Sequence, residues 1–118
     1  MAPDSNPDCI FCKIAAGTIP VKRVYEDDQV LAFPDAHPQA PVHLLVIPKL
    51  HLASLVDAKP AHRELLGHLL AAAAEVARQE GLDKGYRLVI NTGPDGGQTV
   101  AHLHIHVLGK RAMHWPPG

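Results

Sequence analysis

Residues 102–108 read HLHIHVL, with histidine at every second position and apolar residues between. Side chains alternate between the two faces of a β-strand, so this spacing predicts a strand with one imidazole face and one apolar face. A solvent-facing strand has no need of three histidines, and histidine is the side chain whose charge changes near neutral pH. We therefore interpret His102, His104 and His106 as part of a functional site.

The remainder of the chain predicts four more strands and two helices. A short helix is expected over residues 9–16, ended by Gly17, and apolar residues at three- and four-residue spacings predict a long helix over residues 60–80, ended by Gly81. The expected strands cover residues 24–26, 30–33, 43–47, 86–91 and 102–108. Strands interrupted by one long helix predict an α+β fold: a five-stranded antiparallel sheet with one long and one short helix.

The length of 118 residues fits one domain, with a flexible N-terminus at residues 1–7 and a C-terminal tail at residues 110–118. The formal charge of -1 argues against binding to nucleic acid through bulk electrostatics. No segment approaches the roughly 20 apolar residues that span a bilayer, and we expect a cytoplasmic protein with no membrane partner.

A turn-rich segment precedes the histidines. Gly96 and Gly97 permit a close approach of backbone to a ligand, and their N–H groups are candidates to hold a phosphate. Asn91 adds an amide donor to the same loop. A plain hairpin turn explains the glycines equally well. The glycines therefore indicate a phosphate-binding loop only in combination with the histidines a few residues further on.

The pattern of residues 102–108 resembles the signature of the histidine triad (HIT) family, in which three histidines alternate with apolar residues. Residues 45–49 (LVIPK), 91–93 (NTG), 97–100 (GQTV) and 113–118 (MHWPPG) also look like this family, so that the resemblance covers residues 8–118. The ending and the length resemble the Hint branch, which implies a homodimeric purine nucleoside phosphoramidate hydrolase. The branch that splits dinucleoside polyphosphates fits less well.

The resemblance implies a role for each matching position. His104 would be the nucleophile, completed by His43, His102 and His106, and Asp35 would bind the ribose hydroxyls. Ile10, Phe11, Ile19, Phe33 and Leu45 would line a slot for the base, and Asn91, Gly97, Gln98 and Thr99 would surround the α-phosphate. The apolar residues are equally compatible with ordinary core, and Asp35 with a turn. Pro34 and Ala36 beside Asp35, and Thr99, depart from common residues of the Hint branch.

The chemistry of the residues agrees with these roles. A neutral imidazole is a competent nucleophile toward phosphorus, and one ring N–H held by a carbonyl would direct the other nitrogen at the substrate. As the middle histidine, His104 is placed to share a phosphate with neighbours on both sides. This step requires no metal cofactor. Three alternatives remain open: a catalytic zinc on the His-x-His-x-His strand, a nucleotide-binding scaffold with little turnover, and dinucleoside polyphosphate hydrolysis.

Cys9 and Cys12 have the C-x-x-C spacing of two thiolate ligands, and His51 is a candidate third ligand of a structural zinc site. A similar cysteine pair in galactose-1-phosphate uridylyltransferases, of the wider superfamily, joins a downstream histidine and the first histidine of the triad, which implies His51 and His102. Two reduced thiols at the start of a helix are the alternative.

A homodimer is predicted from the long amphipathic helix, the fourth strand and the apolar C-terminal tail. Trp115 and the two prolines that follow it are too apolar to lie free in water. The resemblance implies that Trp115 reaches towards the active site of the partner.

Overall fold

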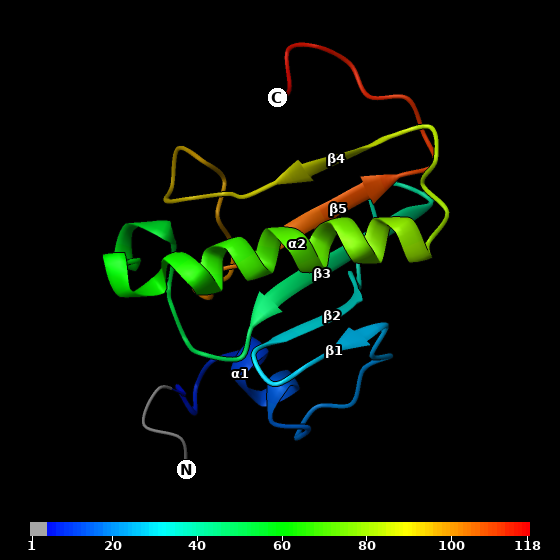
Figure 1. The fold of residues 1–118 in the computed structure, drawn as a ribbon. Helices are drawn as coiled ribbons and strands as arrows, with labels where there is room; N and C mark the ends of the chain where they lie inside the picture. Colours follow the sequence, from blue (N-terminus) through cyan, green and yellow to red (C-terminus); the bar gives the residue numbers. More distant parts are fainter. Residues whose placement is uncertain (1–4) are drawn as a thin grey trace.

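The computed structural model of the protein describes residues 5–118 (Figure 1). Its elements, in chain order, are α1 (Ile10–Ala15), β1 (Tyr25–Glu26), β2 (Val30–Pro34), β3 (Val42–Pro48), the 3-10 helices η1 (Leu55–Asp57) and η2 (Pro60–His62), α2 (Arg63–Gln79), β4 (Tyr86–Val89) and β5 (Ile105–Gly109). The strands form one sheet in the order β1-β2-β3-β5-β4, with every neighbouring pair antiparallel. The predicted sheet, with one long and one short α-helix, is confirmed.

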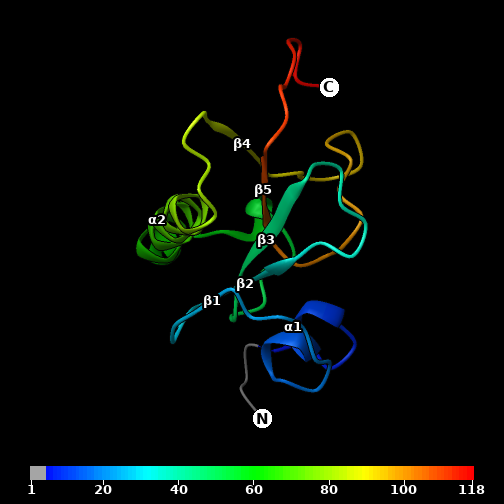
Figure 2. The same ribbon diagram turned by 90° about the vertical axis from the view of Figure 1, so that its right-hand side faces the viewer.

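The two α-helices lie on opposite sides of the sheet (Figure 2). Alternate residues of β2 and β3, such as Val30 and Val46, pack with the apolar face of α2 in the larger core cluster. The residues between them, such as Leu31 and Leu45, pack with Phe11 and other residues of α1 in a smaller cluster. The period of two along each strand therefore builds two different layers.

The boundaries of the long helix differ slightly from the prediction. Residues 60–62 form the separate 3-10 turn η2, and the α-helix begins at Arg63. Pro60 is suited to a first turn, because that turn needs no N–H from it. At the other end Gly81 has a φ of +70°, a conformation that glycine adopts without a steric cost and that ends the helix as predicted.

The prediction that the fifth strand begins at His102 is wrong, since β5 begins at Ile105. The register that pairs Val46 with Ile105 would bring Leu103 opposite Pro48, which has no N–H for the ladder. The N–H of Leu103 donates instead to the carbonyl of Leu52 at 2.6 Å. The alternation of faces continues outside the strand, because Leu103 belongs to the α2 layer and His104 contacts Phe11 of α1.

Among the described residues, 5–9 and 110–118 form no strand or helix. The predicted flexible segment 1–7 falls in part on residues 1–4, which lie outside the described residues, whereas the Asn6 carbonyl accepts a hydrogen bond from the Cys9 N–H at 3.0 Å. In the tail, Trp115 is 83% exposed in the single chain. Within residues 5–118 no helix is both long enough and apolar enough to span a membrane.

Candidate functional site

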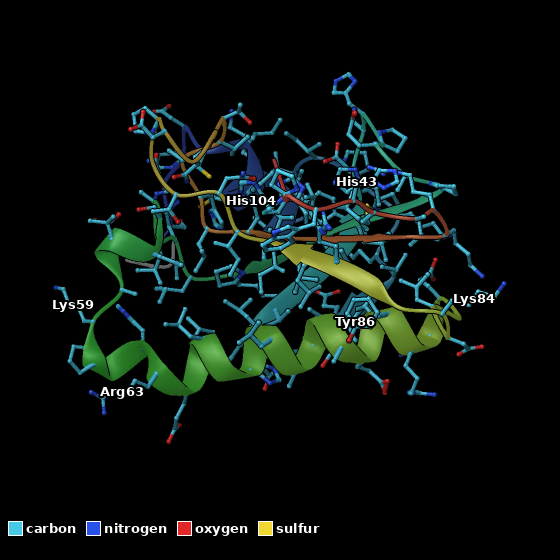
Figure 3. The ribbon with its side chains drawn as sticks, turned by 90° about the horizontal axis from the view of Figure 1, so that it is seen from above. His43, Lys59, Arg63, Lys84, Tyr86 and His104 are labelled. Atoms are coloured by element: carbon cyan, nitrogen blue, oxygen red, sulfur yellow. The ribbon has the colours of Figure 1, made fainter. Side chains whose placement is uncertain are left out.

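The side chains of His43 and of the three triad histidines lie on the side of the sheet opposite α2. Figure 3 labels two of them, His43 and His104. His102, His104 and His43 are buried, with 0%, 5% and 6% of their surface exposed. The triad divides between two groups of side chains: His102 joins the cysteines of α1, and His106 joins His43 and Asp35. The three histidines therefore do not converge on one metal ion, and the geometry does not favour a catalytic zinc on this strand.

The first group, here named the cysteine group, consists of Cys9, Cys12, His51 and His102. One potential ligand atom of each residue lies within 4.8 Å of those of the others. The Nδ1 atom of His102 is 3.2 Å from Cys9 Sγ, 3.5 Å from Cys12 Sγ and 3.2 Å from His51 Nδ1. His51 Nδ1 lies 3.3 Å from Cys12 Sγ. Zinc bound tetrahedrally at ordinary bond lengths would separate its ligands by about 3.3 Å between nitrogens and about 3.6 Å between sulfur and nitrogen. The observed separations fit.

The surroundings of the cysteine group also suit a metal. The Nε2–H of His102 donates to the carbonyl of Pro48 at 2.8 Å, which leaves the lone pair of Nδ1 directed at the group. Burial lowers the pKa of His102 to about 4, so that the ring is neutral as a ligand must be. Backbone N–H groups of Asn6 and Cys12 donate to Cys12 Sγ and Cys9 Sγ, at 3.4 and 3.3 Å. These four residues could hold one metal ion.

His104 has the tautomer that the proposed nucleophile needs. Its Nδ1–H donates to the carbonyl oxygen of His102 at 2.7 Å, which leaves the lone pair on Nε2. The predicted hydrogen bond to a carbonyl is thus present, and the carbonyl is supplied by the first histidine of the triad. The ring of Phe11 packs edge-on against His104, with centroids 5.3 Å apart, and fixes the ring from the side of α1.

The expectation that His104 shares a phosphate with both neighbours is wrong for His102. Both ring nitrogens of His102 already have partners, one at Pro48 and one in the cysteine group. The ring of His106 remains close, with its centroid 5.0 Å from that of His104. His102 can therefore act on the reaction only through its carbonyl and its packing.

His43, His106 and Asp35 form the second group. The backbone N–H of Gln39 donates to His43 Nδ1 at 2.9 Å, so that the hydrogen of the neutral ring is on Nε2. His43 Nε2 lies 2.8 Å from His106 Nδ1 and 3.3 Å from Asp35 Oδ2. His106 Nδ1 therefore accepts, and its own hydrogen is on Nε2. Burial, assisted by repulsion from His104 and His43 and opposed by Asp35, lowers the pKa of His106 to about 4.

The loop expected around the phosphate is held mainly by its own hydrogen bonds. The backbone N–H groups of Gly97 and Gln98 donate to the carbonyls of Pro94 and Gly93, so the two N–H groups are not directed at a ligand in this conformation. The side chain of Gln98 accepts from the Gly93 N–H and donates to Ala53 and Val100. Asn91 Nδ2 donates to the Gly96 carbonyl at 2.6 Å, and Thr99 is exposed.

The residues expected to line the base slot lie at α1 and the adjacent sheet face. Phe11, Phe33 and Leu45 are buried in the smaller core cluster, and Ile19 packs against it. Phe11 and Phe33 meet edge-on, with ring centroids 5.7 Å apart. Ile10 is 49% exposed, and is the residue of this set with the most surface left for a ligand.

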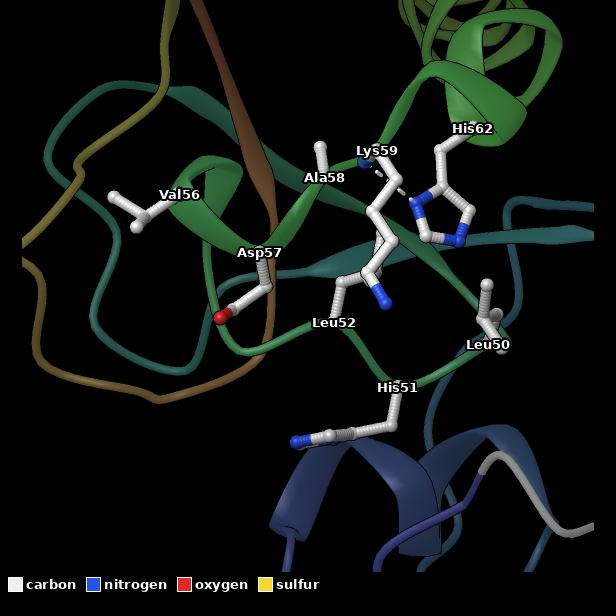
Figure 4. A pocket seen from close by; sticks show the side chains of 8 residues that line it. All are labelled: Leu50, His51, Leu52, Val56, Asp57, Ala58, Lys59 and His62. Atoms are coloured by element: carbon white, nitrogen blue, oxygen red, sulfur yellow. Dashed lines mark hydrogen bonds between the residues drawn. The ribbon is translucent and has the colours of Figure 1, made fainter.

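A surface cavity of about 510 Å³ borders the cysteine group (Figure 4). His51 contributes to its wall, together with Leu50, Leu52 and residues of η1 and η2. Of the four residues of the cysteine group, His51 is the one that lines this cavity.

Two participants in the site were missed by sequence reasoning: the backbone N–H of Gln39 and the carbonyl of Pro48. Both set the tautomer of a histidine. Both are main-chain groups, which every residue possesses, so no side-chain pattern could have pointed to them.

Comparison with known proteins agrees with this geometry. A protein of Synechococcus elongatus, named as an uncharacterized HIT-like protein, is 61% identical over 113 residues, which cover 96% of this chain and 99% of that protein. A 14 kDa zinc-binding protein of Zea mays is 55% identical, with 98% of this chain and 91% of that protein covered. The crystal structure of a HIT family hydrolase from Legionella pneumophila superposes with a TM-score of 0.92 at 53% identity, over 94% of this chain and 100% of the other.

The profile of the HIT domain matches residues 16–113, which is most of the chain and includes all three histidines of the triad. The protein therefore belongs to the HIT domain family.

Proposed function

We propose that the protein hydrolyses the P–N bond of purine nucleoside phosphoramidates, such as conjugates of AMP with an amine. The observation that carries the proposal is the tautomer of His104, whose Nδ1–H is bound to the His102 carbonyl while Nε2 keeps its lone pair. Nε2 attacks the α-phosphorus, the P–N bond to the amine breaks, and the amine leaves with a proton. Water then attacks the phosphorus, which releases the nucleoside monophosphate and restores His104.

His106 supports the same step from the neighbouring position. Its Nε2–H is available as a donor because Nδ1 accepts from His43. A pKa of about 4 keeps the ring neutral at pH 7, so that it can stabilise charge on a phosphoryl oxygen by a hydrogen bond. The departing amine takes its proton from an imidazolium or from the substrate.

The nucleotide contacts are part of the proposal. Asp35 binds the ribose hydroxyls, and Ile10, Phe11, Ile19, Phe33 and Leu45 enclose the base. Asn91, Gly97, Gln98 and Thr99 lie around the α-phosphate. Two N–H groups of that loop donate within it, and Thr99 is exposed, so we propose its hydroxyl as a donor to the phosphate.

We assign a structural zinc ion to Cys9, Cys12, His51 and His102, in keeping with the fit of their ligand atoms. The name of the Zea mays relative supports this assignment. When bound, the ion would cross-link the start of α1 to the segment after β3, which carries His51, and to the segment before β5, which carries His102. The chemical step uses the imidazoles alone.

A homodimer completes the proposal. β4 is an edge strand of the sheet, and Tyr86 on it is 42% exposed. Leu70 on α2 is 50% exposed and Trp115 in the tail is 83% exposed. We infer that a second subunit covers these three side chains together with the open edge of β4, which would otherwise leave its backbone groups unpaired.

The test is a turnover assay that compares an adenosine phosphoramidate with a diadenosine polyphosphate, each with and without a chelator. Faster cleavage of the phosphoramidate, with the wild-type rate retained immediately after chelator is added, is the expected result. Preference for the polyphosphate would show a hydrolase of the other branch. Binding of AMP without turnover of either compound would show a nucleotide-binding scaffold, and immediate loss of activity with chelator would show a catalytic metal.

A further inference from the structure

His102 belongs to the cysteine group and is also hydrogen-bonded to the proposed nucleophile, His104. His102 directs Nδ1 to Cys9 and Cys12, while its carbonyl oxygen accepts the Nδ1–H of His104 at 2.7 Å. The His102 ring is also tied to Pro48 and is fully buried. Because the ring is fully buried and has little space for rotation about its own side-chain bonds, we expect a shift of the ring to be passed to the carbonyl that orients His104.

A second connection runs through α1. Cys9 caps the N-terminus of this helix and Cys12 lies within it, so Phe11 stands between two ligands. The Phe11 ring packs against His102 and His104, with centroid distances of 5.8 and 5.3 Å. Ile10, which belongs to the proposed base slot, is its neighbour on the same helix.

Helix α1 has only six residues, too few to be stable without tertiary contacts. The contacts available to it are apolar packing on the sheet, a hydrogen bond from Arg23 to the Ile14 carbonyl at 2.8 Å, and the cysteine group. A metal ion would join α1 to His51 and His102 by four bonds. Without the ion, weak hydrogen bonds of sulfur take their place, and the helix that carries Ile10 and Phe11 is held less firmly.

We propose that the metal site positions the nucleotide site, so that zinc and nucleotide bind cooperatively, with Phe11 and His102 as the positioning residues between them. This inference rests on the proposed nucleotide binding. Cooperativity of binding is reciprocal: zinc raises the affinity for nucleotide by the same factor by which nucleotide raises the affinity for zinc. Couplings of this kind are commonly about 5- to 150-fold, and we expect at least about 5-fold here.

The experiment measures both affinities in the wild-type protein. The dissociation constant of AMP is determined by calorimetry for zinc-loaded protein, for protein stripped by a chelator, and for stripped protein reloaded with zinc. The affinity for zinc is determined by competition with a chromophoric chelator, with and without saturating AMP. AMP should bind at least about 5-fold more weakly to the stripped protein, and AMP should strengthen zinc binding by the same factor.

Two variants separate positioning from a general effect on folding. Cys9→Ser with Cys12→Ser should show the AMP affinity of stripped protein whether or not zinc is added. Phe11→Leu keeps all four ligands and the His102 connection but removes the ring that links the two sites through α1, so the ratio of AMP affinities with and without zinc should fall below that of the wild type. Coupling that persists at full strength in Phe11→Leu would show that Phe11 does not carry it, and would overturn the inference that this residue positions the nucleotide site.

The remaining outcomes separate the inference from the proposed function. Equal AMP affinity in loaded and stripped wild-type protein would overturn the coupling and leave nucleotide binding intact. No AMP binding to the zinc-loaded protein would contradict the proposed function itself.

Discussion

Nε2 of His43 lies 2.8 Å from Nδ1 of His106, and the other nitrogen of His43 accepts the backbone N–H of Gln39. The direction of this chain of hydrogen bonds is fixed, because a backbone N–H can only donate. His43, His106 and Asp35 have the residue types of a metal site, but Nε2 of His43 carries a hydrogen and has no lone pair for an ion. In the cysteine group the Pro48 carbonyl has the opposite effect and frees Nδ1 of His102.

This difference predicts one zinc ion per chain rather than two. Metal analysis of protein purified without chelator should give one equivalent for the wild type and none for Cys9→Ser with Cys12→Ser. The variant Asp35→Asn, which alters only the second group, should keep the full equivalent. Equal zinc content in the wild type and the double cysteine variant would refute the assignment of the site.

The low pKa of His106 predicts a pH dependence of stability. Its pKa is about 4 in the folded protein, against 6.5 for an unperturbed histidine, so the unfolded chain binds more protons between these values. This contribution to stability is therefore complete above pH 6.5 and is lost as the pH falls towards 4. At pH 5 the loss is about 2 kcal/mol.

Urea unfolding at pH 7 and pH 5 measures this effect, with His106→Gln as the control that lacks the titrating ring. The wild type should lose about 2 kcal/mol more than the variant between the two pH values. The same pH dependence in both proteins would show that His106 is not shifted.

Gly96 is required by the close approach of two backbone segments. A Cβ atom at this position would lie 2.3 Å from the carbonyl oxygen of Thr92, so the loop beside the triad would have to move. Gly96→Ala should therefore cost about 1–3 kcal/mol of unfolding free energy and slow turnover. Gly93 is the matched control in the same loop: it has open space and a φ of +71°, which asparagine tolerates. Thermal unfolding should show Gly93→Asn closer to the wild type than Gly96→Ala.

Features of the fold that depend on a repeating pattern within one segment can be predicted from the sequence. The apolar spacing of residues 60–80 predicts α2, and the alternation on either side of Ile105 predicts two faces; both predictions are confirmed by the two core layers. The start of β5 was not visible, because it depends on Pro48 and on a bond from Leu103 to Leu52, residues about 50 positions away. The division of the triad between two groups has the same cause. The ring of His102 is oriented by Pro48 and Cys9, and the ring of His106 by His43, all of which are distant in sequence.

The proposed dimer predicts a particle of twice the 12.7 kDa chain mass in light scattering at micromolar concentration. Tyr86→Lys places a charge on the edge strand β4 and should shift the protein to the monomer. Val56→Lys is the control, since Val56 is 80% exposed in η1, outside the proposed interface. A monomeric wild type would contradict the dimer, and a monomeric Val56→Lys would contradict this choice of surface.

The central claim is that Nε2 of His104 forms a covalent bond to the phosphorus of the nucleotide. His104→Ala should lower kcat by several orders of magnitude while AMP still binds, and His106→Ala should lower kcat less, because it removes a donor and not the nucleophile. The most direct measurement is rapid quenching of the wild type during turnover of an adenosine phosphoramidate, followed by peptide mass spectrometry. We predict a nucleoside monophosphate attached to His104. An adduct on another residue, or a His104→Ala variant with near wild-type turnover, would contradict the account.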